Sequence, residues 1–97
     1  MNRAELRAPM FALGRLMATP AALQALADAG RTAADFIGRH VRGDWSEMSV
    51  EDAATNTVAV FEGSRILSSY ALDAEQRVWV ITEADRNLTT VLLSTEY

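Results

Sequence analysis

The sequence predicts an α+β fold, with about three helices packed on a three- to four-stranded antiparallel sheet that ends in a C-terminal β-meander. Three capping residues, each followed by helix-forming residues and then by glycine, occur between positions 19 and 63. Segments of alternating or β-branched residues follow between positions 65 and 94, with connections short enough to indicate antiparallel neighbours. Because 97 residues give room for one core, residues 1–97 are expected to form a single domain.

Each predicted helix begins at a hydroxyl side chain and ends at a glycine. Threonine or serine at the N-cap accepts hydrogen bonds from the first free N–H groups, and glycine adopts the left-handed conformation after the last turn. The pairs are Thr19 with Gly30, Thr32 with Gly43, and Ser49 with Gly63, and Pro20 follows the first cap. Ser49 and Asp52 also resemble a capping box with a shortened acid.

A spacing of three and four residues defines the face that each of the last two helices is expected to bury. In the second helix this face consists of Ala33, Phe36, Ile37, His40 and Val41. In the third helix it consists of Ala53, Ala54, Thr57, Val58 and Phe61. Asp35 and Arg39 lie four residues apart on the outside of the second helix and are expected to form an ion pair.

The strands are expected mainly after the helices. Alternating, β-branched and aromatic side chains fill three segments, residues 65–72, 77–82 and 89–94. Looser alternation at residues 11–18 indicates a further short strand, and residues 1–10 are expected to be a frayed or short helical lead. Residues 83–87 are interpreted as a hairpin tip, in which Asn87 tolerates the left-handed conformation.

Composition excludes several classes of function. The chain has no cysteine, which excludes disulfides and thiolate chemistry, and it has no known metal or cofactor motif, so neither a metal nor a cofactor is expected. Its net charge of −4 disfavours nucleic-acid binding, which normally depends on a basic patch. No apolar run is long enough to span a membrane, and the broken apolar N-terminus does not resemble a signal peptide. A cytoplasmic protein is expected.

One set of residues fits a catalytic alternative. His40 is the only histidine and, together with Glu83, has the chemistry required for proton transfer. Arg65 and Arg86 have the charge required to stabilise a phosphodiester transition state, as in small ribonucleases and toxins of the barnase or RelE type. His40 also follows Phe36 by one helical turn on an apolar face, which favours a packed histidine over a catalytic one.

A second set of residues fits a binding surface. The connector GDWSEM places two acids beside a tryptophan, which either fills the core or is an exposed anchor, since tryptophan is enriched at interface hot spots. The hairpin tip adds further charges. The candidate contact residues are Asp44, Trp45, Glu47, Glu83, Asp85 and Arg86.

The strings RHVRGDW, GSRILSSY and VWVITEADRNLTTVLLSTEY, together with Asn56, resemble a group of small uncharacterised proteins of bacterial plasmids and related mobile elements, which are often mislabelled as type I restriction endonuclease subunit M or plasmid-related protein. The resemblance covers most of residues 11–97. It is most specific after Arg65, at Trp79, Thr82, Glu83, Asp85, Arg86 and Tyr97. The sequence departs from the group's pattern at Ser46, Asn87 and Ser94, so loop geometry is expected to differ there.

The resemblance implies a non-enzymatic accessory protein of a mobile element. Such proteins often bind and inhibit a host defence component, so an anti-CRISPR or anti-restriction inhibitor with a protein partner is the leading hypothesis. Fold or family analogy alone does not fix function. The small ribonuclease or toxin remains an alternative, and so does a self-associating structural protein whose exposed strand edge pairs with itself.

Overall fold

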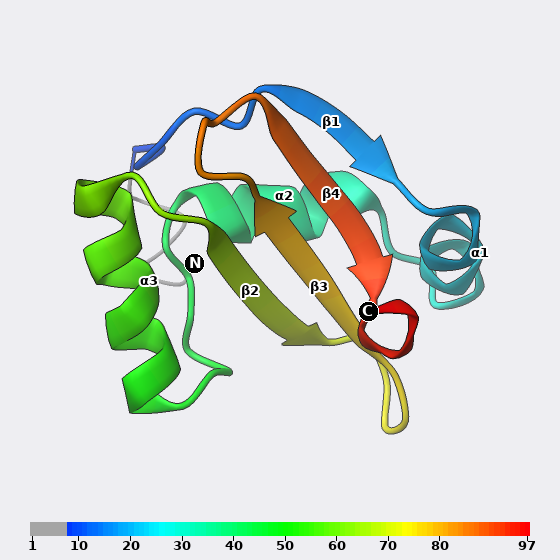
Figure 1. Ribbon diagram of the computed structural model, residues 1–97. Coiled ribbons are helices and arrows are strands. Elements are labelled where there is room, and N and C mark those ends of the chain that lie inside the picture. The colour runs from blue at the N-terminus through cyan, green and yellow to red at the C-terminus, as the bar shows by residue number, and fades with distance from the viewer. Residues whose placement is uncertain (1–7) are drawn as a thin grey trace.

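The structure, a computed structural model, describes residues 8–97 of the chain. Its elements follow in the order β1 (Arg15–Ala18), α1 (Pro20–Asp28), α2 (Ala33–Val41), α3 (Val50–Glu62), β2 (Ile66–Ala71), β3 (Arg77–Thr82), β4 (Leu88–Leu93) and a 3-10 turn, η2 (Ser94–Glu96). In Figure 1, α2 crosses behind a single twisted sheet, α1 lies near the end of β1, and α3 stands beside β2. The predicted α+β class, its three helices and the C-terminal meander are confirmed.

The sheet is mixed, so the prediction of a wholly antiparallel sheet is wrong. The strand order is β1-β4-β3-β2, and the meander of β2, β3 and β4 is antiparallel. Strand β1 pairs parallel to β4, with Arg15 opposite Leu88 and Ala18 opposite Val91. Three helices and two strands separate β1 from β4 in the sequence, so nothing local sets their relative direction. The strands are therefore not all C-terminal to the helices.

The local capping signals act as predicted. The hydroxyl of Thr19 accepts a hydrogen bond from the backbone N–H of Ala22, and Thr32 forms a reciprocal capping box with Asp35. Gly63 ends α3 in the left-handed conformation, with φ of 76°. These contacts satisfy backbone groups that a helix leaves free at its ends.

The hairpin between β3 and β4 forms as expected, with one difference in its tip. Arg86, and not Asn87, adopts the left-handed conformation, with φ of 61°. The side chain of Asp85 accepts the N–H of Asn87, which holds the tip in an Asx turn. The strain at Arg86 is offset by the hydrogen bonds that its guanidinium forms, described below.

The core lies between the sheet and the helices. Phe36 of α2 and Leu26 of α1 pack against Tyr70, Val80 and Val91 of the sheet, and all five are buried. The expected inward face of α2 is confirmed, because Phe36, His40 and Val41 are all buried. The helices therefore cover one face of the sheet.

The predicted inward face of α3 is wrong except at Ala53, which packs against a buried apolar cluster. Val58 is 50% exposed and Phe61 is 82% exposed, whereas Asn56 and Ala59 are buried. Asn56 takes the inward position because its amide binds both backbone groups of Leu67, the N–H and the carbonyl. Hydrogen bonding to a strand edge thus decides the rotation of a helix whose apolar residues do not form one clear stripe.

The expected ion pair between Asp35 and Arg39 is also absent. Asp35 pairs with Arg31 and belongs to the capping box, and Arg39 turns instead toward Asp44 and Glu47. Near the N-terminus, the N–H of Met10 donates to the carbonyl of Val41. The expected lead at residues 1–10 falls mainly outside the described residues. Within residues 8–97, no helix has the length and apolar character needed to cross a membrane.

Candidate functional site

His40 lies at the centre of a buried polar relay. Its Nδ1 atom is 2.6 Å from the Ser68 hydroxyl, and its Nε2 atom is 2.8 Å from the Thr82 hydroxyl. Beyond Ser68, the indole N–H of Trp45 donates to the serine oxygen at 2.8 Å. Beyond Thr82, the hydroxyl of Thr89 lies at 2.7 Å. The relay joins α2 to three separate parts of the fold.

The end of the relay fixes the direction of the hydrogen bonds from Leu13 back to the Nε2 atom of His40. The Thr89 hydroxyl donates its only proton to the carbonyl oxygen of Leu13 at 2.7 Å, so the Thr82 hydroxyl must donate to Thr89. Thr82 then has no proton left for His40, and His40 must donate from Nε2. The neutral ring accepts at Nδ1 from Ser68, which in turn accepts from Trp45. His40 is therefore held as the neutral Nε2–H tautomer.

The surroundings of His40 oppose its protonation. Burial of the ring, and secondly the positive charge of Arg86, lowers the pKa of His40 to about 3. The ring of Phe11 covers the imidazole edge-on, with 5.1 Å between ring centroids. Glu83 forms no hydrogen bond with His40, and the alternation along β3 points it away from Thr82. The structure does not bring the two predicted proton-transfer residues together.

The predicted acidic loop forms an internal ionic clamp. Arg39 binds Asp44 at 2.6 Å through Nε and Glu47 at 2.7 Å through Nη2, while its guanidinium lies over the ring of Tyr70. Glu47 also accepts the backbone N–H of Ala71 at the edge of β2. The Tyr70 hydroxyl donates to the carbonyl of Asp44. These contacts tie α2, the connector and β2 together.

The clamp pairs two carboxylates with one guanidinium, and both carboxylates are held in the ionised form. Burial alone would raise the pKa of Asp44, but hydrogen bonds from Arg39 and Ser46 hold that pKa below its ordinary value. The pKa of Glu47 is likewise lowered, because the N–H of Ala71 and the Arg39 guanidinium outweigh the effect of burial. Both acids are therefore ionised structural groups at neutral pH.

Trp45 is buried, so the expectation that it forms an exposed anchor is not supported. It packs with Ala59 and Ile66 in a second apolar cluster, and its indole N–H belongs to the relay. Asp44 is also buried. Of the two roles that the sequence left open for Trp45, it has the core-filling one.

The two predicted arginines are engaged with the fold. Arg86 donates from Nη1 to the carbonyls of Ser64 and Glu83 and from Nη2 to the carbonyl of Ala59. It thus joins the hairpin tip to the C-terminal end of α3, where a positive charge is favourable. Arg65 donates to the hydroxyl of Tyr97 at 2.6 Å. Among the six predicted binding residues, Glu83 and Asp85 remain at the hairpin tip, where neither forms an ion pair with any other residue of the 8–97 range.

The face of the sheet opposite the helices carries an aromatic stack. Alternation along β2, β3 and β4 directs Leu67, Trp79, Ile81, Thr90 and Leu92 toward this face. Tyr97, which is 64% exposed, packs on Trp79 with 5.3 Å between ring centroids, and Arg65 lies over the Tyr97 ring. Figure 1 shows no helix in front of this face. Within residues 8–97, η2 and Tyr97 pack against β3 at this face.

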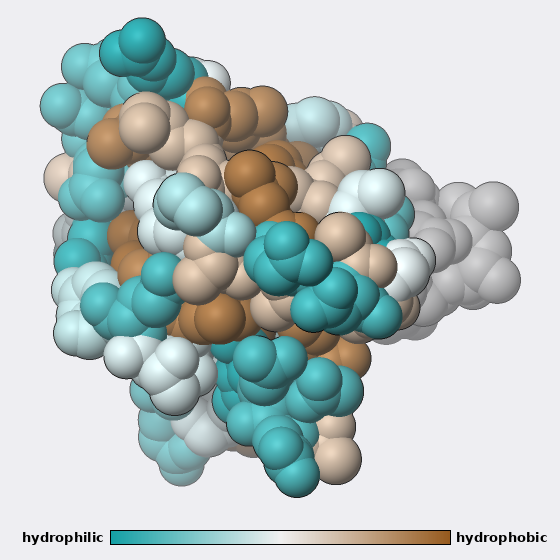
Figure 2. Space-filling view, turned by 90° about the vertical axis from the view of Figure 1, so that its right-hand side faces the viewer, coloured by the Kyte–Doolittle hydropathy of each residue, from teal (hydrophilic) through white to brown (hydrophobic). Residues whose placement is uncertain are grey.

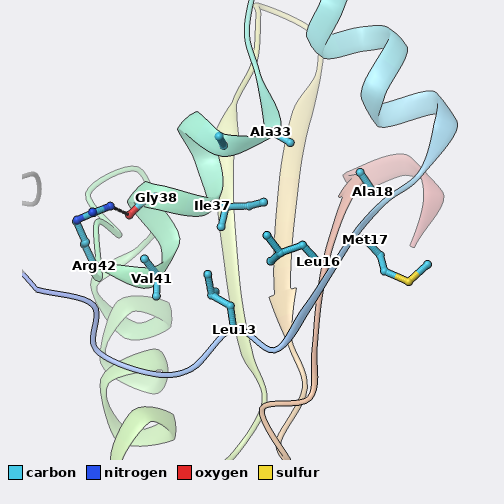
Figure 3. A pocket seen from close by; sticks show the side chains of 10 residues that line it. Leu13, Leu16, Met17, Ala18, Ala33, Ile37, Gly38, Val41 and Arg42 are labelled. Carbon is cyan, nitrogen blue, oxygen red and sulfur yellow. Dashed lines mark hydrogen bonds between the residues drawn. The ribbon is translucent and has the colours of Figure 1, made fainter.

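A second surface lies between β1 and α2. An open apolar groove of about 500 Å³ is lined mainly by Leu13, Leu16, Met17, Ala33, Ile37 and Val41. Figure 3 shows Leu16 directed toward Ile37, while Met17 points to the other side of β1. Figure 2, which views the side of the molecule that carries α1 and the end of β1, shows hydrophobic groups interrupted by hydrophilic ones. Leu16 is 54% exposed and Met17 is 50% exposed.

Sequence reasoning did not find either surface. The aromatic face depends on Tyr97 folding back onto Trp79, a contact between the end of the chain and β3. The groove depends on the parallel pairing of β1 with β4. The weak alternation of residues 11–18 was the only signal for β1. No group of three or more metal-ligating side chains occurs in the described part of the chain.

Comparisons of the chain with protein-family models, with curated proteins and with solved structures found no match in any of the three.

Proposed function

We propose that this protein is a non-enzymatic binding protein that inhibits a protein component of host defence against mobile DNA. The observation that carries the binding role is the aromatic stack of Trp79, Tyr97 and Arg65 on the helix-free face of the sheet. Tyrosine, tryptophan and arginine are the side chains most enriched in the centres of protein interfaces. The defence target follows from the resemblance to mobile-element proteins.

The hairpin tip gives this face an acidic border. Glu83 directly follows β3, and alternation places it on the same side as Trp79 and Ile81. Asp85 lies two residues further along the hairpin tip and is exposed. As in the hypothesis drawn from the sequence, Glu83 and Asp85 are proposed to contact a basic surface of the partner. Asp44, Trp45, Glu47 and Arg86 take structural roles and are no longer part of the proposed contact.

His40 supports a binding role over a catalytic one. A general acid or base requires a pKa near the working pH and a path to the substrate. His40 is fully buried, its pKa is lowered to about 3, and both ring nitrogens are engaged by hydroxyl groups. These properties favour a side chain that fixes the core.

The proposal is tested by plasmid transformation of a host that carries a CRISPR or restriction system. Expression of the protein is expected to raise the transformation efficiency of a targeted plasmid, and Tyr97→Ser is expected to abolish most of that gain. Phe61→Ser is the matched control, since Phe61 is an exposed aromatic residue on α3. No gain with the wild-type protein in either system, or equal loss with both variants, would reject the proposal.

A further inference from the structure

The two edge strands of the sheet differ in whether their outward N–H and carbonyl groups are hydrogen-bonded. Along β2, the outward groups of Leu67 are both bound by the side chain of Asn56, and the outward N–H of Ala71 is bound by Glu47. Side chains thus cover this edge, which is a common way of preventing strand addition. Only Ser69 lies between the two covered positions.

Along β1, no hydrogen bond within residues 8–97 satisfies the outward backbone groups. The N–H groups of Arg15 and Thr19 donate to β4-side carbonyls, so alternation directs the backbone groups of Leu16 and Ala18 away from the sheet. No side chain from residues 8–97 binds these outward groups. The open edge also borders the apolar groove, so hydrogen-bonding groups and apolar side chains are available side by side.

We infer that β1 of a second copy of this chain pairs antiparallel with β1, about a two-fold axis at Met17. In this register Leu16 faces Ala18 of the second copy, and Ala18 faces Leu16 of the second copy. Each pair exchanges two backbone hydrogen bonds, so all outward groups of both strands are satisfied. Met17 faces Met17 of the second copy as a non-hydrogen-bonded pair. Registers centred on Leu16 or Ala18 leave some of these groups unpaired.

The side chains fit this arrangement. The two Leu16 side chains lie on the face that carries α2, so each extends toward the groove of the other copy, and the two grooves join. Arg15 faces Thr19 of the second copy, so the arginines are separated along the strands and no like charges oppose each other. The interface is isologous, as in most homodimers. The inference does not depend on the proposed function.

The register is tested by introducing single cysteines into a chain that has none. Met17→Cys places two thiols at a non-hydrogen-bonded pair, where the Cα atoms are about 4.5 Å apart and a disulfide fits. Under mild oxidation this variant is expected to form a covalent dimer rapidly. Val58→Cys on α3 is the matched control, because Val58 has the same 50% exposure as Met17. Equal cross-linking of both variants would overturn the register.

Light scattering over increasing concentration provides the second measurement on the full chain. The mass is expected to rise from monomer to dimer, and Leu16→Asp is expected to weaken the dimer at least about tenfold because a charge enters each groove. Val58→Asp is expected to leave the dimer unchanged. Leu16 is more than half exposed, so this variant retains its fold, as circular dichroism will verify. A wild-type chain that stays monomeric would overturn the inference, and the β1 edge would then be available only to a strand of another protein.

Discussion

At the scale of single residues, the polar side chains that attract attention in the sequence are the ones that hold the core together. His40 and Arg86 are each bound by two groups from distant segments, and Asp44 is bound by Arg39 at the end of α2 and by Ser46. A functional site and a buried polar network consist of the same residue types, so the sequence does not distinguish them. Only the surroundings distinguish them, because a buried polar group must be fully hydrogen-bonded.

His40 predicts a specific dependence of stability on pH. Its pKa in the folded chain is about 3, below the ordinary value of 6.5, so the unfolded chain takes up a proton first as pH falls. The free energy of unfolding is therefore expected to decrease below pH 6.5, by about 2 kcal/mol between pH 7 and pH 5. Urea unfolding at both pH values measures this difference.

The control for this prediction is His40→Gln, which is less stable but carries no titrating group. Its loss of stability between pH 7 and pH 5 is expected to be much smaller. Asp44 and Glu47 have lowered pKa values, so their contribution is complete above their ordinary values of 3.8 and 4.5 and is lost only at lower pH. Equal losses in wild type and variant would contradict the assigned state of His40.

Although Arg86 is partly exposed, its replacement is expected to lower the free energy of unfolding substantially. Arg86→Met removes three hydrogen bonds to carbonyls of α3 and the hairpin, and is expected to lower the free energy of unfolding by about 2–3 kcal/mol. Arg15→Met is the matched control, because Arg15 is exposed and its side chain has no partner in the described part of the chain. It is expected to change stability by less than about 0.5 kcal/mol. Similar values for both variants would refute the role of Arg86 in joining the hairpin tip to α3.

At the scale of elements, the entry of the chain into β1 depends on one glycine. Gly14 has φ of 66°, and a Cβ atom there would lie 2.4 Å from the carbonyl carbon of Asn87. The backbone of the hairpin tip therefore passes directly over Gly14. This close approach is what allows Arg15 to begin the parallel pairing with β4.

A matched pair of glycine substitutions tests this approach. Gly63→Ala places a Cβ in open space at φ of 76°, so its cost is the left-handed conformation alone, about 1 kcal/mol. Gly14→Ala adds a clash with backbone and is expected to cost at least twice as much, measured by urea unfolding. Equal costs at the two positions would show that the hairpin does not pack over Gly14.

The helices and strands also show which parts of the fold can be predicted from the sequence. Caps and glycines depend on residues within four positions, so Thr19, Thr32, Ser49 and Gly63 delimit the helices correctly. The rotation of α3 was mispredicted because Asn56 binds Leu67, eleven residues away. The direction of β1 was mispredicted because its partner lies more than 70 residues away. Local signals therefore fix elements, and long-range hydrogen bonds fix their arrangement.

At the scale of the whole molecule, the same distinction applies to the candidate surfaces. The apolar groove and the aromatic face each combine residues from segments far apart in the chain. Residue types alone pointed to the charged connector, where Asp44 and Trp45 are buried. In the proposed dimer, β1 pairing would extend the sheet to eight strands and place two aromatic faces on one continuous surface.

Side chains cover the backbone groups of one sheet edge and leave those of the other edge exposed, and amide hydrogen exchange measures this difference at single residues. In dilute protein, slow exchange is expected at Leu67 and Ala71, which side chains cover, and fast exchange is expected at Leu16 and Ala18. The exchange at Leu16 and Ala18 is expected to slow as concentration rises. Protection of Leu16 and Ala18 equal to that of Leu67 at every concentration would show that the two edges do not differ.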